Sequence, residues 1–171
     1  EGARLVTLSS TGHKISGIRW DDIHFNDSEY EKWAAYGQSK TAASLLAVEV
    51  DKRMKDSGVR AFGVHPGGIM TPLQRHLEQE EMVALGWMDK DGQPTERVAK
   101  MFKSATQGAS TTLWAATSPQ LDGIGGVYCE NCEVAAPTDD GENARFIGVN
   151  DWAVDSEEAS RLWDETEHML S

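Results

Sequence analysis

The stretch "AAYGQSKTAASLLAVEV", residues 34–50, predicts the element around which this fold is organised. Apolar residues such as Leu45 and Val48 recur near helical spacing, and alanines fill the early turns. Such spacing is typical of a helix that buries one face. We therefore predict a long helix over about residues 33–55, with Gly58 as its stop signal.

Two short apolar runs flank the predicted helix. "ARLVTLS", residues 3–9, precedes it, and "VRAFGV", residues 59–64, follows it. Both runs are rich in residues that favour buried parallel strands. A strand, a helix and a strand in this order make a right-handed parallel crossover. The sequence thus predicts an α/β fold.

Further helices and a third parallel strand are predicted in the second half of the chain. Residues 71–93 indicate a short helix and a loop, and residues 95–118 indicate one long helix or a pair. "GIGGVYCENCEV", residues 123–134, is predicted to be the third strand. The expected architecture is three parallel strands covered by helices.

Residues 137–171 are predicted to form an acidic extension that ends in a helix. The amphipathic pattern places this helix at residues 156–170. Asp155 and Glu158 are expected to cap its start as a pair. The side chains expected to face inward are Leu162, Trp163 and Met169.

Composition narrows the class of protein and its partners. A chain of 171 residues suffices for one domain with a sizeable core. Its net charge of -12 arises from residues 71–171, which hold 7 Lys or Arg against 19 Asp or Glu. Phosphate binding uses clustered basic residues, so the composition argues against nucleic acid as a partner.

The sequence shows no segment typical of membrane proteins or of secretion. No stretch approaches the roughly 20 consecutive apolar residues that a membrane span requires. A basic and apolar leader with a small-residue cleavage site is not evident either. We therefore predict no membrane span and a cytoplasmic location.

Cys129 and Cys132 are the only cysteines, and they lie in C-x-x-C spacing. A structural zinc site usually needs a second ligand pair, which the five scattered histidines do not supply at the right spacing. A thioredoxin-like motif would open a helix, whereas this pair follows a strand-like run. We predict two reduced structural thiols and no metal site, with redox activity or a bound metal as alternatives.

Tyr36 and Lys40 are candidates for chemistry because they stand four positions apart on the predicted helix. Side chains at this spacing emerge on one helix face. A cation about 5 Å from a phenol favours the phenolate by roughly 3 kcal/mol at an effective dielectric near 20. Such a phenol suits proton transfer on an alcohol or ketone. The alternative is an ordinary solvated turn, since Tyr-x-x-x-Lys occurs by chance in many helices.

Motifs on either side of the pair favour the chemical interpretation. "VTLSSTG", residues 6–12, ends one predicted strand, and "HPGGIMT", residues 65–71, ends the next. Ligands bind at the carboxyl edge of parallel sheets, where these ends meet. The order of "LVTLSS", "YGQSK" and "GVHPGGIMT" resembles the second half of a short-chain dehydrogenase/reductase, nearest to the retinol-dehydrogenase and protochlorophyllide-reductase-like branch. The resemblance covers about residues 3–135.

This resemblance implies a fold, an activity and roles for individual residues. The fold would be a partial Rossmann-like doubly wound parallel sheet, strands five to seven of seven, with flanking helices. The activity would be hydride transfer between NAD or NADP and a hydrophobic alcohol, aldehyde or ketone. Tyr36 would be the acid/base, Lys40 would hold the nicotinamide ribose hydroxyls, and Ser10 rather than Ser9 would hydrogen-bond the substrate oxygen. The residues implied for cofactor binding are Tyr36, Lys40, Pro66, Gly67, Ile69 and Thr71.

Two features depart from the family pattern. The glycine-rich turn T-G-x-x-x-G-x-G is absent, since "TGHKISG", residues 11–17, has a different glycine spacing. The first predicted strand would leave an unpaired apolar edge. We therefore predict that residues 1–171 are a single domain, the C-terminal half of a longer enzyme, and inactive as given. The choice between NAD and NADP would lie in the other half. A non-catalytic binding or scaffolding module is the alternative.

Other expectations concern the substrate, the subunit contacts and a different activity. Residues 71–93 contain several large apolar side chains and are predicted to form a substrate lid. A homodimer through the Tyr36 helix is expected from the resemblance. Ser10 with His13 or His65 could suggest a hydrolase, but the G-x-S-x-G elbow is absent. His65 is expected to be a packing residue at a strand end.

Overall fold

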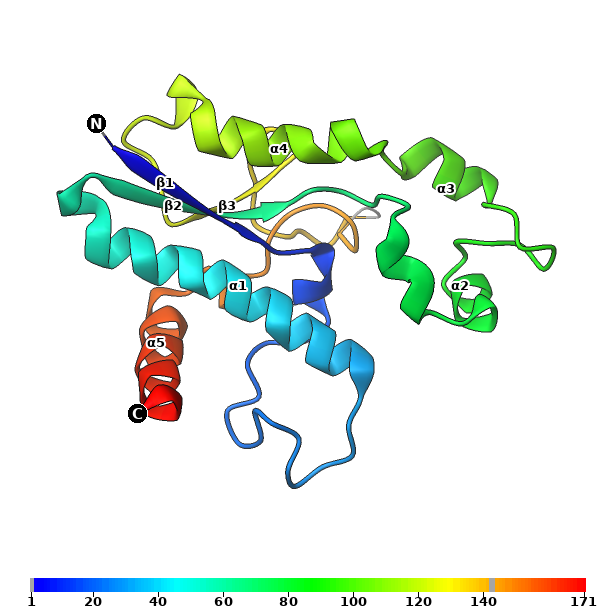
Figure 1. The fold of residues 1–171 in the computed structure, drawn as a ribbon, viewed down its shortest axis with the longest axis horizontal. Coiled ribbons are helices and arrows are strands. Elements are labelled where there is room, and N and C mark those ends of the chain that lie inside the picture. Colours follow the sequence, from blue (N-terminus) through cyan, green and yellow to red (C-terminus); the bar gives the residue numbers. More distant parts are fainter. Residues whose placement is uncertain (1, 142–143) are drawn as a thin grey trace.

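A four-stranded sheet lies between helices in the computed structural model, which describes residues 2–141 and 144–171 (Figure 1). Its strands, in spatial order, are β1 (Ala3–Leu8), β2 (Val59–His65), β3 (Val127–Glu130) and β4 (Glu133–Val134). The first three strands are parallel, and β4 runs antiparallel to β3. The predicted α/β class with a parallel sheet is confirmed. Two residues of the predicted 137–171 extension, Glu142 and Asn143, lie outside the described residues.

In the described part of the chain, five helices and several short 3-10 turns connect and cover the strands. The helices are α1 (Lys32–Met54), α2 (Gln79–Ala84), α3 (Glu96–Met101), α4 (Ala105–Thr117) and α5 (Ser156–Leu170). The 3-10 turns are η1 (Thr11–Lys14), η2 (Lys55–Ser57), η3 (Pro72–His76), η4 (Pro119–Leu121) and η5 (Asp151–Ala153). Residues 95–118 thus form a pair of helices, one of the two predicted options. None of the helices in the described part of the chain is both long and apolar enough to cross a membrane.

The ends of α1 follow from local chemistry and agree with the sequence prediction to within one residue. The Glu31 carboxylate accepts hydrogen bonds from the backbone N–H groups of Trp33 and Ala34, which the first turn leaves unpaired. After η2, Gly58 adopts a left-handed conformation with φ of 79°. This residue turns the chain directly into β2, as its predicted role as a stop signal requires.

Alternate side chains of β2 build two apolar layers, one on each face of the sheet. Phe62 and Val64 pack on the face covered by α4, next to Ala115. Ala61 points to the opposite face and packs against α1 residues that include Val50. All of these side chains are buried. Because both faces are covered, β2 has the continuous apolar character of a central parallel strand (Figure 1).

The predicted single strand over residues 123–134 is wrong in its second half. Asn131 and Cys132 have φ values of 51° and 59°, so the chain reverses and continues as β4. Two successive residues with positive φ are typical of the tight turn that matches the twist of a β-hairpin. The described sheet therefore has four strands rather than three.

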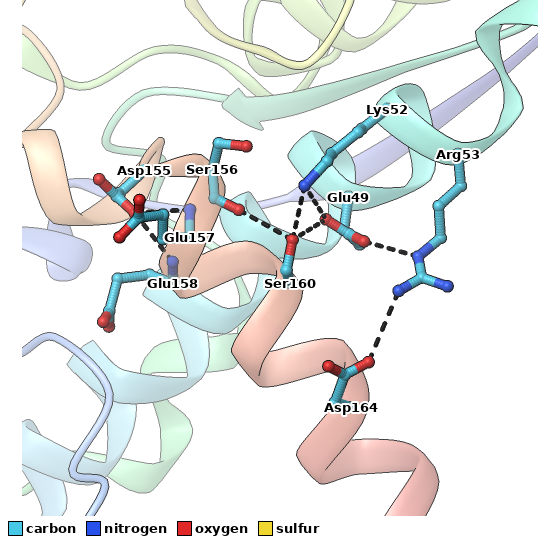
Figure 2. Close-up of polar contacts among 9 residues, drawn as sticks. All are labelled: Glu49, Lys52, Arg53, Asp155, Ser156, Glu157, Glu158, Ser160 and Asp164. Carbon is cyan, nitrogen blue, oxygen red and sulfur yellow. Dashed lines mark hydrogen bonds and ion pairs between the residues drawn. The ribbon is translucent and has the colours of Figure 1, made fainter.

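Helix α5 packs against the outer side of α1 through a buried acidic residue (Figure 2). The Glu49 side chain is 3% exposed, and Oε1 accepts a 2.6 Å bond from Arg53 Nε. Its other oxygen accepts a 3.0 Å bond from the Ser160 hydroxyl of α5 and lies 3.7 Å from Lys52 Nζ. Arg53 also lies 4.7 Å from the ring centre of Trp163. Charge pairing and apolar packing thus act together at this contact.

Two details predicted for α5 are wrong. Asp155 does cap the helix, accepting 2.8 Å bonds from the backbone of Glu157 and Glu158, but the Glu158 carboxylate accepts from Trp20 Nε1 instead of returning to the cap. Met169 was expected to face inward, yet it is 42% exposed. It lies in the last turn, where it lines a surface hollow beside Trp20.

We expect Glu49→Ala to lower the free energy of unfolding by about 2 kcal/mol, because it leaves Arg53 and Ser160 without their common acceptor. Urea denaturation would measure this loss. Glu167→Ala, an exposed substitution on the same helix as Ser160, is the control and should change the value by less than about 0.5 kcal/mol. Equal effects of the two substitutions would contradict the structural role of Glu49.

Candidate active site

Ser10 lies two residues beyond the carboxyl end of β1, where it caps the start of η1. Its backbone is extended, and its Oγ accepts a 3.0 Å hydrogen bond from the Gly12 backbone N–H. Accepting this bond leaves the hydroxyl hydrogen free to donate elsewhere. The predicted serine is therefore available as a donor at the carboxyl edge of the sheet.

The Tyr36 ring and the Ser10 hydroxyl both lie close to Gly12. A β-carbon placed on Gly12 would lie 2.4 Å from Cε1 of Tyr36 and 3.5 Å from Oγ of Ser10. The phenol ring and the serine hydroxyl thus approach one point, which only a glycine leaves open. A β-carbon on Gly37 would in turn lie 2.9 Å from the Gly12 carbonyl oxygen. Both sides of this contact need glycine for α1 to come so close to η1.

Lys40 occupies the next turn of α1, with its ammonium between the phenol ring and β1. Its Nζ lies 5.5 Å from the ring centre of Tyr36 and donates a 3.3 Å hydrogen bond to the Leu8 carbonyl oxygen. The structure therefore brings together the three residues that the sequence analysis named for chemistry.

Ser9 has a different position from Ser10, although the two are adjacent in sequence. It is 3% exposed, and its hydroxyl donates a 2.7 Å hydrogen bond to the backbone carbonyl oxygen of Lys40. Its own N–H donates to the carbonyl oxygen of Val64 in β2. Ser9 thus fastens the helix turn of Lys40 to the sheet, whereas Ser10 keeps its hydroxyl hydrogen free.

The Pro66–Thr71 turn follows β2 and is shaped by two glycines. Gly67 has φ of 95°, and a β-carbon there would lie 2.8 Å from the Lys103 side chain. The Lys103 backbone N–H donates a 2.8 Å bond to the Gly68 carbonyl oxygen. Lys103, which precedes α4, thereby holds this turn in place.

Gln74 contacts the residues that the resemblance assigns to the nicotinamide carboxamide. Its Nε2 donates a 2.9 Å bond to the carbonyl oxygen of Ile69, and its Oε1 accepts a 2.7 Å bond from the backbone N–H of Thr71. The Thr71 hydroxyl accepts from the Leu73 N–H as the cap of η3. In this structure, the Ile69 and Thr71 backbone therefore binds a primary carboxamide, the chemical group that a nicotinamide would present.

The predicted lid is connected to the start of α1. Glu81 of α2 forms an ion pair with Lys32, and the Trp33 side chain is a further hydrogen-bond donor to it. The rings of Trp33 and Tyr36 then meet edge to face, 6.1 Å apart. Trp87 of the same segment packs against Phe102, 5.7 Å between ring centres. The 71–93 segment thus lies next to the helix that carries Tyr36.

Two buried histidines lie at the same edge of the sheet, and the sequence analysis considered them for a site role only as partners of Ser10 in a hydrolase that it argued against. His13 is fully buried, and its pKa is lowered to about 4, first by burial and less by Lys14. His65 ends β2, and burial, with Lys103 next in importance, lowers its pKa to about 4 as well. Both rings are therefore neutral at neutral pH, which agrees with the packing role expected of His65.

Neither cysteine is in a disulfide. Burial raises the pKa of the Cys129 thiol to about 12, so it stays protonated. Cys132 Sγ lies 3.9 Å from the Thr111 hydroxyl. Within residues 2–141 and 144–171, no three His, Cys, Asp or Glu side chains are placed to bind one metal ion.

Several named proteins are similar in sequence to this chain over almost its whole length. The chain is 38% identical over 169 residues to the short-chain dehydrogenase/reductase prx1 of Penicillium roqueforti, covering 99% of this chain and 47% of that protein. A probable oxidoreductase of Streptomyces lividans is 40% identical over 162 residues, with coverage of 95% and 53%. Retinol dehydrogenase 12 of Mus musculus is 32% identical, with coverage of 95% and 44%. The chain belongs to the short-chain dehydrogenase/reductase family.

This short-chain dehydrogenase/reductase chain spans about half the length of the curated relatives it matches. A crystal structure of an uncharacterised Mycobacterium paratuberculosis protein matches it with a TM-score of 0.62, covering 98% of this chain and 50% of the other. At 24% identity that likeness bears on the fold alone. No protein-family model matches the chain.

We expect the protein to lose stability as the pH falls from about 7.5 to about 5. A histidine whose folded pKa lies below its unfolded value binds its proton more readily in the unfolded chain, so acid favours unfolding. For a pKa lowered from 6.5 to about 4, the free energy of unfolding falls over this pH range by roughly 2 kcal/mol for each of His13 and His65. Urea denaturation at the two pH values measures it.

His65→Phe is the matched variant for this measurement. The Nδ1 atom of His65 is buried and has no hydrogen-bond partner among the described residues, so an apolar ring of similar shape should be tolerated. Between the two pH values, the free energy of unfolding should fall by roughly 2 kcal/mol less in the variant than in the wild type. His24→Phe, on an exposed loop, should keep the wild-type dependence. An unchanged dependence in His65→Phe would show that another group is responsible.

Proposed function

We propose that this chain supplies the acid/base group and the nicotinamide-binding turn of an NAD(P)-dependent oxidoreductase that acts on a hydrophobic alcohol, aldehyde or ketone. The observation that carries the proposal is the convergence of Ser10 and Tyr36 on Gly12, with the Lys40 ammonium beside the phenol ring. A donor, a phenol and a fixed cation at one point are the groups that proton transfer on a substrate oxygen requires.

Each of the three residues has a distinct task in this proposal. The Ser10 hydroxyl, which accepts from Gly12, has its hydrogen free to donate to the substrate oxygen. The Tyr36 phenol gives a proton to that oxygen in reduction and takes it back in oxidation. From the family resemblance, the Lys40 ammonium beside the phenol ring would bind ribose hydroxyls. The nicotinamide would supply or accept the hydride.

The Pro66–Thr71 turn supports the nicotinamide part of the proposal, because its backbone binds the carboxamide of Gln74, which caps η3. Ile69 offers a carbonyl acceptor and Thr71 an N–H donor, and Gln74 satisfies both. We propose that the carboxamide of the cofactor takes the place of the Gln74 side chain. Ile69 and Thr71 contribute backbone atoms here, so the contact would serve NAD and NADP alike.

Apolar side chains in the 71–93 segment support the proposed substrate class. Leu73 is 63% exposed and Met70, next to the segment, is 40% exposed, so large apolar groups face outward beside the turn. The ion pair between Glu81 and Lys32 holds the segment near Tyr36. Substrate contacts would come from this lid. A cytoplasmic location remains a prediction, and so does a homodimer through α1, part of whose surface α5 covers.

The outer edge of β1 supports the proposal that this chain is one half of a larger catalytic domain. β1 is the first strand of the described sheet, and its Leu5 and Leu8 are 37% and 52% exposed. An open apolar edge strand favours pairing with a further strand. Titration of the 171 residues with NADPH, followed by nicotinamide fluorescence, separates this proposal from an independent binding module. Micromolar binding by the 171 residues alone would favour the module.

We expect Tyr36→Phe in the full-length protein to lower kcat by at least about a hundredfold, because it removes the proton donor and keeps the ring. Oxidation of NADPH with an aliphatic aldehyde such as decanal measures the rate. Tyr30→Phe is the matched control, since Tyr30 is 67% exposed and should retain wild-type turnover. If Tyr36→Phe keeps most of its rate, Tyr36 is not the acid/base.

Gln74→Ala should bind NADPH several-fold more tightly than the wild type, because the cofactor no longer displaces a bound side chain. Fluorescence titration of the full-length protein gives the two Kd values. Gln79→Ala, an exposed glutamine at the start of α2, should leave Kd unchanged. Weaker binding by Gln74→Ala would indicate that Gln74 serves to shape the turn, as a helix cap, and does not compete.

A further inference from the structure

His13 connects the candidate catalytic serine to a distant part of the chain. It lies in η1, three residues after Ser10, and is fully buried. Its Nδ1 is 2.7 Å from the backbone carbonyl oxygen of Ser10. Its Nε2 is 3.1 Å from the backbone nitrogen of Asn150, a residue 137 positions away in sequence. One ring therefore spans two backbone segments.

The two partners determine the tautomer of this ring. The Asn150 backbone nitrogen can only donate, so His13 Nε2 must accept and carries no proton. Nδ1 then bears the single proton and donates it to the Ser10 carbonyl oxygen. With both ring nitrogens used by backbone groups, His13 is not free to act as a base on the Ser10 hydroxyl. This arrangement argues against the hydrolase that the sequence alone could suggest.

The backbone of His13 is held as firmly as its ring. Its carbonyl oxygen accepts a 3.0 Å bond from Trp152 Nε1 and lies 3.3 Å from the Thr41 hydroxyl of α1. Its ring packs against Tyr128, with 5.0 Å between the ring centres. Trp152 belongs to the 147–153 segment, Thr41 to the Tyr36 helix and Tyr128 to β3.

A neighbouring lysine attaches η1 to the same segment. Lys14 Nζ donates a 3.0 Å bond to the Ile147 carbonyl oxygen, and Gly148 N–H donates to the buried carboxylate of Glu130 at the end of β3. Residues 147–153 are therefore anchored to the sheet as well as to η1. They form a fixed support against which the His13 ring is placed.

We propose that His13 is a positioning residue for Ser10, and that residues 147–153 are the part of the chain that gives it a fixed place. By holding the Ser10 carbonyl, the ring sets the backbone that carries the Ser10 hydroxyl near the Tyr36 ring. A shift of this backbone would misdirect the donor without removing it. The inference rests on the proposed function, since it assigns His13 a task only if Ser10 contacts substrate.

A double-mutant cycle in the full-length protein tests this role, using Ser10→Ala, His13→Phe and the combination of both. Oxidation of NADPH with decanal gives kcat and KM. We expect each single substitution to lower kcat about tenfold or more, with KM for NADPH changed less than about threefold. If His13 acts through Ser10, adding His13→Phe to Ser10→Ala should lower kcat by less than about twofold further.

The outcomes separate the positioning role from the proposed function. Independent losses that multiply in the double variant would overturn the positioning role and leave the proposed function standing. A Ser10→Ala variant with wild-type kcat would overturn both. His13→Asn, which keeps a donor for the Ser10 carbonyl, should recover most of the rate, and His24→Phe should match the wild type. If thermal melting shows that His13→Phe does not fold, Trp152→Phe removes one bond to the same residue and enters the cycle instead.

Nitrogen-15 NMR of labelled histidines supplies a readout that does not depend on turnover. In the full-length protein at neutral pH, one histidine ring should be in the neutral form with its proton on Nδ1, and His13→Asn should remove that signal. A His13 ring protonated on Nε2 would contradict the hydrogen bonds on which the role is based.

Discussion

The close approach of α1 to the η1 turn is the constraint on which the candidate site depends. A β-carbon on Gly37 would collide with the Gly12 carbonyl oxygen, and a β-carbon on Gly12 would collide with the Tyr36 ring. The buried Thr41 then ties the helix to the turn by donating a 2.7 Å bond to the Ser16 carbonyl oxygen. Because Tyr36 and Lys40 lie on one ridge of α1, this single helix position places both groups at the carboxyl end of β1.

Beneath these groups, the polar atoms are mostly paired within the protein. Ser9 binds the Lys40 carbonyl, and His13 uses both ring nitrogens on backbone groups. A buried polar group without a partner costs free energy, so such pairing allows a polar site to lie deep in the fold. It also leaves little freedom for the groups above to rearrange. Proton transfer benefits from such a fixed arrangement, because the environment need not reorganise as charge moves to the substrate oxygen.

The sequence predicts best what is determined by local pattern. The period of apolar residues and the Gly58 stop signal place α1 to within one residue, and the motif order brings Ser10, Tyr36 and Lys40 to one edge. Contacts between distant residues carry no such local signal. The hydrogen bond from Asn150 to His13 joins two loops, and the sequence of neither loop indicates which segment it contacts. The sequence analysis did not predict the hairpin turn, because the β pattern continues through it. Only the positive φ of Asn131 and Cys132 marks the reversal of the chain.

Charge at the carboxyl edge of the sheet differs from the charge of the chain as a whole. The net charge is -12, yet two lysine ammonium groups at this edge bind neutral oxygens, Lys40 at Leu8 and Lys103 at the Asn131 amide. Neither cation is neutralised by these partners, so each keeps its attraction for an anion. Exposed charges interact over a Debye length of only about 8 Å at physiological ionic strength, so distant carboxylates are largely screened from this edge. The proposed dinucleotide, an anion, would therefore meet lysine ammonium groups at this edge in spite of the acidic composition of the chain.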